Sequence, residues 1–312
     1  MGARAAIIGA GVAGLAAARS LQQAGVDVVV FEKSRGLGGR MATRRAGDLQ
    51  FDHGVQYVSA KGPAFTEELE RWRTCGAAAE WFGGAFVGAP RMTAPARLMG
   101  EGLTVVQGAL VDRLERRGSQ WFVHAGDGPG AHAFDAVALA TPAPQATPIL
   151  ASAGVTFEAL ERVQFAPCWA LMAAFDAAAY DGPDWMAPEG DTLAWLARDN
   201  SKPGRDAGRL TFTAHASATW SRQHLENEPG AVAPLLLAAM QRLTGVRAEP
   251  SYLSAHRWRF ALVERPAGEP FLFDRDRRIG ACGDWCLGAR VESAFDSGRA
   301  MGAAVAAALG AL

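Results

Sequence analysis

Residues 5–14, Ala-Ala-Ile-Ile-Gly-Ala-Gly-Val-Ala-Gly, decide the fold of this 312-residue chain. The four apolar residues at the start predict a short strand. The G-x-G-x-x-G turn that follows leads into residues 12–24, whose apolar side chains recur at helical spacing. Residues 26–31, Val-Asp-Val-Val-Val-Phe, predict a second strand, which ends in Glu32. This order of strand, glycine turn, helix, strand and acid predicts a βαβ unit of the kind that binds dinucleotides.

Each part of this unit has a physical role toward a dinucleotide. Gly9 permits the tight turn, Gly11 lets the backbone approach a pyrophosphate, and Gly14 allows close packing of helix and strand. The helix start at Val12 and Ala13 offers free N–H groups and a partial positive charge to phosphates. The acid that ends the second strand can accept hydrogen bonds from a ribose diol. The alternative, a glycine-rich helix start without a ligand, does not explain this context on both sides.

The segment Gly-Leu-Gly-Gly-Arg-Met-Ala-Thr at residues 36–43 narrows the ligand to a flavin. A G-G-R-x-x-[ST] segment at this place is typical of FAD domains of the glutathione-reductase type, whereas nicotinamide enzymes have no general need for it. Its glycines would bring more backbone toward the cofactor, and Arg40 would supply a cation for the pyrophosphate. The alternative for Arg40 is a surface ion pair.

Near the C-terminus, residues 279–284 predict a strand that closes in a Gly-Asp turn, and residues 291–309 predict a helix. Asp284 could bind the ribityl hydroxyls of a flavin, or it could simply cap a helix. The helix start at Arg290, Val291 and Glu292 could aim N–H groups at the N1–C2=O edge of the ring. That edge becomes negative on reduction, so the placement would stabilise the reduced flavin.

Composition excludes several classes of function. Hydrophobic residues make up 49%, charged residues 20%, and the net charge is −1, without a basic stripe, so we expect no nucleic-acid partner. The four cysteines form no C-x-x-C pair and no H-E-x-x-H motif occurs, so neither a metal site nor a disulfide framework is expected. Cys286 could tether a flavin or, as the alternative, be a small buried residue.

The apolar N-terminal run has the phasing of a nucleotide turn rather than of a secretory signal, and residues 300–312 are too short to cross a membrane. We expect a cytoplasmic protein that does not bind membranes.

The chain between these motifs predicts two interleaved domains. Short strands are predicted at residues 104–107, 110–116 and 120–124 as a small meander, followed by a return strand at 134–140 and preceded by a helix at 63–75. The tryptophan-rich region from 151 to 273 predicts strands at 193–197, 210–215 and 254–261 and a helix at 235–243. We expect one or two of its tryptophans to meet a substrate. The prediction is a mixed α/β fold in which residues 1–72, 95–150 and 274–312 form the FAD-binding domain, and residues 73–94 and 151–273 form a substrate domain with a mixed sheet.

Six segments together resemble the renalase-like FAD oxidoreductases, particularly the bacterial members, which are short relatives of the flavin amine oxidases. The segments are residues 9–14, Glu32, residues 36–43, Phe51-Asp52-His53-Gly54-Val55-Gln56-Tyr57, Ala255-His256-Arg257-Trp258-Arg259-Phe260-Ala261, and Gly283-Asp284-Trp285 with Arg290-Val291-Glu292. The D-H-G-x-Q-Y and H-R-W-R segments are the most specific. Gly36 departs from many amine-oxidase relatives, which place Arg there.

The resemblance implies a two-domain fold of the p-hydroxybenzoate hydroxylase type with non-covalent FAD. It also implies oxidation of NAD(P)H isomers that carry their extra hydride at the wrong ring carbon, giving NAD(P)+ and, from O2, hydrogen peroxide. From the motifs and the resemblance, the candidate FAD-binding residues are Gly9, Gly11, Val12, Ala13, Gly14, Glu32, Lys33, Gly38, Gly39, Arg40, Met41, His53, Gly54, Val111, Asp284, Arg290, Val291 and Glu292.

Gln56, Tyr57, His256 and Trp258 are the candidates for the substrate pocket. Strand alternation places His256, Trp258 and Phe260 on one face, where the first two could contact a nicotinamide ring or, as the alternative, pack in the core between the domains. No second G-x-G-x-x-G occurs, so a nicotinamide nucleotide would have to enter this pocket as substrate. Hydride transfer from a dihydropyridine needs no protein base, and the chain shows no evident acid–base pair or triad. An amine oxidase and a non-catalytic FAD-binding protein are the alternatives, and an NAD-dependent dehydrogenase is the least favoured.

Overall fold

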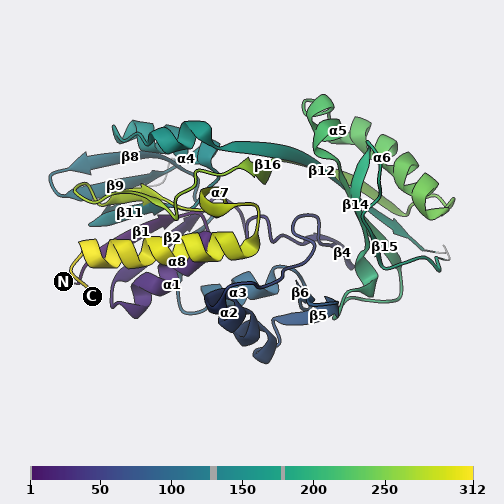
Figure 1. The fold of residues 1–312 in the computed structure, drawn as a ribbon, viewed down its shortest axis with the longest axis horizontal. Coiled ribbons are helices and arrows are strands. Elements are labelled where there is room, and N and C mark those ends of the chain that lie inside the picture. The colour runs from purple at the N-terminus through teal and green to yellow at the C-terminus, as the bar shows by residue number, and fades with distance from the viewer. Residues whose placement is uncertain (1, 127–131, 177–179, 312) are drawn as a thin grey trace.

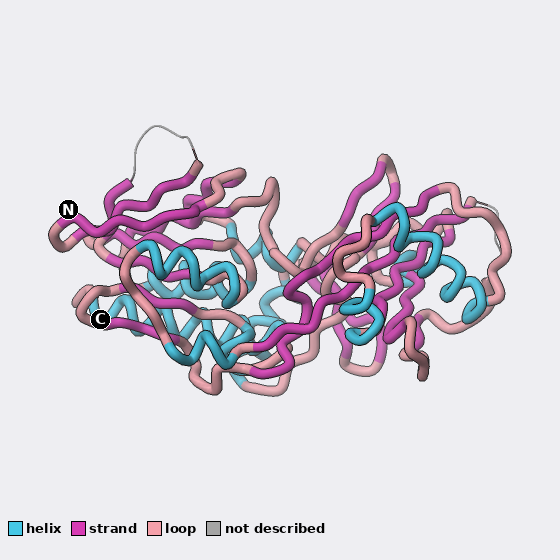
Figure 2. Tube along the Cα trace, turned by 90° about the horizontal axis from the view of Figure 1, so that it is seen from above, coloured by secondary structure: helices cyan, strands magenta, loops and turns pink. Residues whose placement is uncertain are grey.

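The computed structural model describes residues 2–126, 132–176 and 180–311. Two lobes lie side by side along the long axis, and the first and last described residues lie at the same end of the first lobe (Figures 1 and 2). The two long strands β12 (Gln164–Phe175) and β16 (Tyr252–Arg265) run from beside the first lobe into the second (Figure 1).

Among the described residues, the first lobe is built on a six-stranded sheet in the order β17-β18-β11-β1-β2-β7. Its strands are β1 (Arg4–Ile8), β2 (Asp27–Glu32), β7 (Thr104–Gln107), β11 (Ala136–Leu139), β17 (Leu272–Asp274) and β18 (Ile279–Ala281). All pair in parallel except β17 with β18. Strands from the N-terminal and C-terminal parts of the chain therefore share one sheet.

The two faces of this sheet carry different layers. Alternate residues of β1 point to opposite faces, so that Ala5 and Ile7 pack against the helices α1 (Val12–Gln23) and α8 (Val291–Ala308), while Ala6 and Ile8 join the core under β8, β9 and α4. The second layer consists of β8 (Val111–Arg117), β9 (Gln120–Ala125), β10 (His132–Phe134) and α4 (Ala143–Ser152). The helix α8 begins at Val291, as predicted.

Two details of the first lobe differ from the sequence prediction. The strand predicted at residues 104–107 is β7, which pairs in parallel with β2 instead of joining the meander. The single strand predicted at 134–140 is divided into β10 and β11, which belong to different sheets. The division falls at Asp135, whose carboxylate accepts a hydrogen bond from the backbone N–H of Arg4 at 2.9 Å and whose own N–H donates to the carbonyl of Arg4.

The second lobe contains, within the described ranges, a five-stranded sheet in the order β13-β14-β15-β12-β16, whose strands all pair antiparallel, so the mixed sheet predicted for the substrate domain is wrong. Its other strands are β13 (Trp185–Met186), β14 (Leu193–Arg198) and β15 (Leu210–Ala216), and its covering helices are α5 (Ala218–Gln223) and α6 (Pro229–Thr244). The long strand β12, which pairs with β15 and β16, is not among the predicted strands. The helix α6 ends at Gly245 in the left-handed conformation, as predicted, but begins at Pro229 rather than near Leu235.

The remaining helices and strands of the described residues lie outside these two sheets. They are β3 (Arg44–Ala46), β4 (Leu49–Phe51), α2 (Pro63–Thr74), β5 (Ala78–Phe82), β6 (Ala85–Gly88), α3 (Ala94–Gly100), α7 (Asp284–Leu287) and the 3-10 helices η1 (Glu158–Arg162) and η2 (Asp199–Ser201). The domain boundaries given above remain a prediction.

Candidate cofactor site

The glycine turn after β1 has the close contacts that glycine alone permits. Gly9 has a φ of +106°, and a Cβ at Gly14 would lie 1.9 Å from the carbonyl oxygen of Gly9. Gly11, by contrast, has an ordinary φ of −75°, and a Cβ built on it would meet no atom within 4 Å. The structure therefore explains Gly9 and Gly14 by packing, whereas the open space over Gly11 fits the approach of a ligand.

The Gly-Gly-Arg segment lies against this turn. Gly11 and Gly38 form an isolated parallel bridge, in which the N–H of Gly38 donates to the carbonyl of Ala10 at 2.9 Å. Gly38 and Gly39 both have positive φ, and a Cβ on Gly39 would lie 3.5 Å from the Cα of Gly11. The two glycine-rich segments that the sequence singles out thus meet at the N-terminus of α1.

Glu32 ends β2 beside the same turn and is 6% exposed. Its carboxylate accepts hydrogen bonds from the backbone N–H groups of Ala10 at 2.8 Å and Ser34 at 2.7 Å. Each carboxylate oxygen has a second lone pair, so both can still accept a ribose hydroxyl. Glu32 therefore fixes the turn and can still accept hydrogen bonds from a ribose diol.

Arg40 and Asp284 bring the two ends of the chain together. Arg40 Nη2 lies 2.5 Å from Asp284 Oδ1, and Arg40 Nη1 donates to the carbonyl of Ala261 at 3.0 Å. Asp284 is the first residue of α7, whose N-cap is Gly283, and its side chain makes no capping bond. The capping role is therefore excluded for Asp284, and Arg40 is paired with a nearly buried carboxylate rather than with a surface partner.

A bulge in β16 makes the Ala261 carbonyl available to Arg40. Ala166 of β12 pairs with Leu262, whereas Cys168 pairs with Trp258, so three residues of β16 face one residue of β12. That one residue is Pro167, which has no N–H to donate to the ladder.

The start of α8 is held against the loop before α2. The Glu292 carboxylate accepts hydrogen bonds from the N–H groups of Lys61 and Gly62, and Arg290 donates to the carbonyl of Ser59 at 2.8 Å. The side chains of Glu292 and Arg290 are also paired with each other. Both side chains thus anchor protein loops, and what the α8 start offers to a ligand is its first-turn N–H groups, including that of Val291.

His53, His256 and Trp258 form one aromatic cluster. The ring of His53 stacks on Trp258 with centroids 5.2 Å apart, and His256 contacts both rings edge-on. The Trp258 indole N–H donates to the carbonyl of His53 at 2.9 Å. Burial, together with His256 and Arg44, lowers the pKa of His53 to about 3, and burial followed by Arg44 lowers the pKa of His256 to about 4. The cluster is therefore uncharged at neutral pH.

Two buried polar atoms beside the candidate site have no hydrogen-bond partner among the described residues. One is His53 Nδ1, and the other is Thr141 Oγ1, whose side chain lies 3.3 Å from the place of a Cβ on Gly9. Unpartnered buried polar groups are rare because each costs free energy. Their positions beside the segment 53–57 and beside the glycine turn fit a polar ligand that reaches both.

Gln56 is held by a buried network that the sequence analysis missed. Its amide donates to the backbone carbonyls of Asp52 and Gly54 and accepts from Lys202 Nζ at 3.2 Å. Lys202 is fully buried and lies 2.5 Å from Asp199. Burial raises the pKa of Asp52, but Lys202 and Arg205 outweigh it and hold that pKa at about 2. The scarcity of lysine in this chain is the one sequence signal that could have singled out Lys202.

Five other predicted site residues lie in different parts of the structure. Tyr57 is 41% exposed, and Val111 is buried at the start of β8. Lys33 donates to Gln145 at an exposed position, and Met41 is buried in the core on the α1 side of the sheet. Gly54 approaches the chain closely, because a Cβ there would lie 1.9 Å from the Arg40 carbonyl oxygen.

Cys286 is buried in the core between the first sheet and α4. Burial raises the pKa of its thiol to about 12, so the thiolate that a covalent tether requires is disfavoured.

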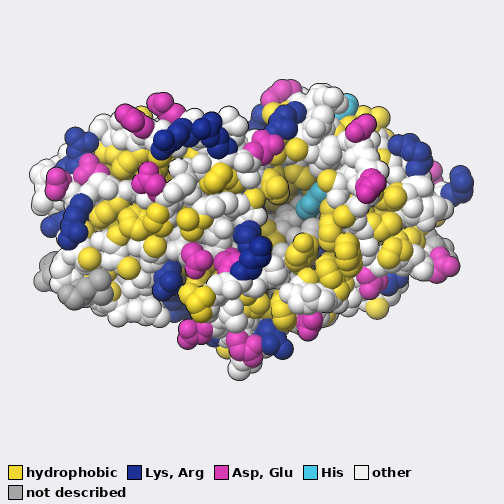
Figure 3. All heavy atoms as spheres, in the orientation of Figure 1, with side chains coloured by type: hydrophobic (Ala, Val, Ile, Leu, Met, Phe, Trp, Pro, Cys, Tyr) yellow, Lys and Arg dark blue, Asp and Glu magenta, His cyan; other side chains and the backbone are white. Residues whose placement is uncertain are grey.

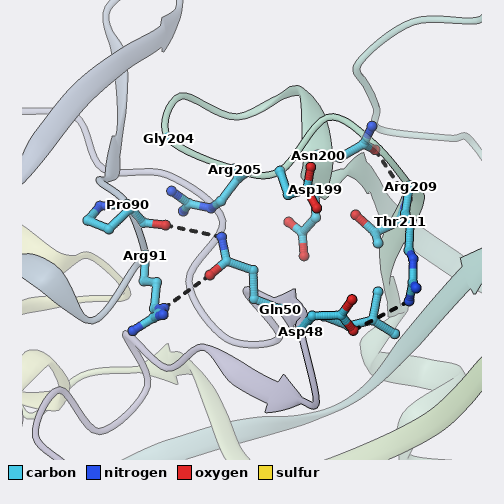
Figure 4. A pocket seen from close by; sticks show the side chains of 12 residues that line it. Asp48, Gln50, Pro90, Arg91, Asp199, Asn200, Gly204, Arg205, Arg209 and Thr211 are labelled. Atoms are coloured by element: carbon cyan, nitrogen blue, oxygen red, sulfur yellow. Dashed lines mark hydrogen bonds and ion pairs between the residues drawn. The ribbon is translucent and has the colours of Figure 1, made fainter.

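The surface is hollowed over the middle of the molecule, between the lobes, and a histidine side chain shows at the edge of the hollow (Figure 3). A separate cavity of about 230 Å³ lies between the β3–β4 hairpin, the loop at Pro90 and the segment after η2. In Figure 4, Gln50 faces Pro90 and Arg91, which lie on the same side of it, and it is hydrogen-bonded to both. None of the predicted site residues lines this second cavity.

No group of three or more His, Cys, Asp or Glu side chains among the described residues could hold a metal ion. No helix among them combines the length and the apolar character that crossing a membrane requires.

Comparison with known proteins agrees with this geometry. Residues 7–72 match the family model of an NAD(P)-binding Rossmann-like domain. The first lobe contains a Rossmann-type dinucleotide-binding domain. In fold, the chain is similar to a protein from Exiguobacterium sp. 255-15 assigned as a protoporphyrinogen oxidase, with a TM-score of 0.77, 13% identity, and coverage of 98% of this chain and 99% of that one.

It is also similar to the cyclohexylamine oxidase from Brevibacterium oxydans IH-35A, with a TM-score of 0.69, 13% identity and coverage of 98% and 99%. A double mutant of a putrescine oxidase, from a redesign of its cofactor binding, gives a TM-score of 0.68 at 15% identity and coverage of 98% and 100%. The mixed α/β fold predicted from the sequence is thus confirmed.

Proposed function

We propose that this protein is an FAD-dependent oxidoreductase with non-covalently bound FAD. The observation that carries the proposal is the contact of Arg40 with Asp284, which joins the Gly-Gly-Arg segment to the Gly-Asp turn from the other end of the chain. Together with the open space over Gly11, this contact would form a cradle for FAD, with the pyrophosphate at Gly11 and the flavin ring at the start of α8. The fold likeness to oxidases supports the same class of protein.

The residues present fit FAD. Gly11 and the first turn of α1 would hold the pyrophosphate, Glu32 would accept from a ribose, and Asp284 would accept from ribityl hydroxyls. The first-turn N–H groups of α8 would face a developing negative charge, which favours the reduced form. Bound FAD would supply the hydride acceptor, and the chain supplies binding and orientation.

For the substrate, we propose dihydro-isomers of NAD(P)H, which lose a hydride to become NAD(P)+, with O2 taking both electrons to give H2O2. The uncharged cluster of His53, His256 and Trp258 supports this proposal, because it offers aromatic faces without a charged base. A dihydropyridine needs no base to give up a hydride, since its ring nitrogen supplies the electrons. We further propose that the protein acts in the cytoplasm, without a nucleic-acid or membrane partner.

Anaerobic stopped-flow mixing of the FAD-loaded protein with 2- or 6-dihydroNAD(P) tests the substrate. Bleaching of the flavin absorbance within seconds, followed by peroxide formation when O2 is admitted, is the expected result. An unchanged flavin spectrum with every isomer would refute the substrate assignment while leaving the cofactor assignment in place.

An amine oxidase is the second candidate, because the chain shares its fold with putrescine and cyclohexylamine oxidases and has aromatic side chains such as Tyr57 next to the predicted site. Peroxide release from a panel of amines distinguishes it from the first. A non-catalytic FAD-binding protein would be yellow, and only dithionite would reduce it.

A further inference from the structure

Four aromatic rings next to the candidate site form a cluster in which each ring contacts two of the others. We call it the ring platform, and it consists of Tyr57, Phe82, Trp185 and Trp195. Tyr57 contacts Phe82 and Trp195 at centroid distances of 5.6 and 5.7 Å, Phe82 stacks on Trp185 at 4.6 Å, and Trp185 stacks on Trp195 at 5.1 Å with an interplanar angle of 8°. The rings come from the loop after Gln56, from β5, from the edge strand β13 and from its neighbour β14.

The platform is not a closed piece of core. Tyr57 is 41% exposed and Trp185 is 37% exposed, and both are among the large apolar side chains that the fold leaves at the surface. The indole N–H of Trp195 is buried without an acceptor among the described residues. A cluster of large rings that is half open to water and incompletely hydrogen-bonded is typical of a binding surface rather than of a core.

The platform is continuous with the cofactor site. Tyr57 directly follows Gln56, and the same segment contains Gly54, which lies against the Arg40 carbonyl, and His53, which stacks on Trp258. One short segment therefore connects the aromatic cluster of His53, His256 and Trp258 with the ring platform. A ligand that has one ring at the first cluster and a second ring several atoms away could contact both.

We propose that the ring platform binds the adenine ring of a dinucleotide substrate by stacking, while the nicotinamide end lies at the flavin. This inference rests on the proposed function, since it deepens the assignment of the substrate. It supplies what the sequence lacks, because no second G-x-G-x-x-G turn is present to hold the adenosine half of the substrate. Stacking on aromatic side chains tolerates any base and needs no dedicated nucleotide domain.

The test uses the FAD-loaded protein, so that the Rossmann site is already filled. Anaerobic flavin reduction is measured with a dihydronicotinamide dinucleotide and with the corresponding mononucleotide, which lacks adenine. Trp185→Ala is expected to weaken the apparent binding of the dinucleotide about tenfold, leaving its limiting reduction rate and the binding of the mononucleotide unchanged.

Matched variants separate stacking from a general loss of structure. Trp185→Phe keeps a ring and is expected to restore most of the dinucleotide affinity. Leu235→Ala removes an exposed apolar side chain on α6, 48% exposed against 37% for Trp185, and is expected to change neither substrate's binding. Equal weakening of dinucleotide and mononucleotide by Trp185→Ala, or no weakening of either, would overturn the platform.

A second measurement does not depend on turnover. ADP-ribose is added to the FAD-loaded protein, and the intrinsic tryptophan fluorescence is followed. Quenching that is lost in Trp185→Ala and kept in Leu235→Ala supports the platform even if no dihydronicotinamide reduces the flavin, in which case the proposed substrate fails alone. Absence of any Trp185-dependent binding of ADP-ribose would overturn the platform even if the flavin is reduced rapidly.

Discussion

Gly11→Ala separates the role of this glycine in the fold from its role toward a ligand. A Cβ at Gly11 would meet no atom within 4 Å, and φ is −75°, so alanine fits without strain. Alanine is a poorer N-cap than glycine, which costs roughly 1 kcal/mol, but it lowers the entropy of the unfolded chain, which contributes about 0.4–1 kcal/mol of stability. These effects nearly cancel, so the free energy of unfolding of the apoprotein should change by less than about 1 kcal/mol.

The same substitution should weaken FAD binding by at least about tenfold, because the methyl group occupies the space where we place the pyrophosphate. The assay pairs urea denaturation of the apoprotein with a titration of FAD fluorescence. Gly190→Ala, outside the predicted cofactor segments, is the matched control, since a Cβ there also meets no atom within 4 Å and should change neither quantity. Normal FAD affinity in Gly11→Ala would refute the reasoning, as would a large loss of apoprotein stability.

Three further predictions concern stability, each measured by urea denaturation. Arg40→Met leaves the nearly buried Asp284 without its cation. The free energy of unfolding should fall by about 2 kcal/mol, between the values for exposed and buried ion pairs. A double-mutant cycle with Asp284→Asn that shows no coupling would contradict this. Gly298→Ala would place a Cβ 2.0 Å from the Ala13 carbonyl oxygen where α1 and α8 cross, so a loss of about 1–3 kcal/mol is expected, and an unchanged midpoint would show that the helices are not so close. His53 has a pKa of about 3 in the folded protein and 6.5 ordinarily, so between these values the unfolded chain binds a proton that the folded one does not. As the pH falls from 6 to 4, His53 should therefore lower the free energy of unfolding by about 1.4 kcal/mol per pH unit. His53→Asn should remove that part of the slope, and an unchanged slope would refute the buried neutral state.

The elements that carry the cofactor motifs could be predicted because local sequence decides them. The apolar run of β1, the glycine turn and the start of α8 follow from spacing and from residues whose backbone freedom is specific. The meeting of Gly11 with Gly38 was expected on chemical grounds, since both segments were assigned to the same cofactor.

Other features depend on tertiary contacts that no local pattern reports. The strand β12 consists mostly of small and apolar residues and contains Pro167, and neither alternation nor length marks it as a strand. Lys202 gives no local signal either, because its role depends on Asp52, which lies 150 positions away in the chain. Arg40 was expected to face a pyrophosphate, but its contact with Asp284 joins segments 244 positions apart and arises only when the fold is complete.

The visible absorption spectrum of the purified protein tests the central claim most directly. The account predicts a yellow protein whose flavin spectrum is lost from the protein fraction on denaturation, with one FAD released per chain. A colourless protein that takes up no FAD on addition would contradict the claim that both ends of the chain hold a single flavin.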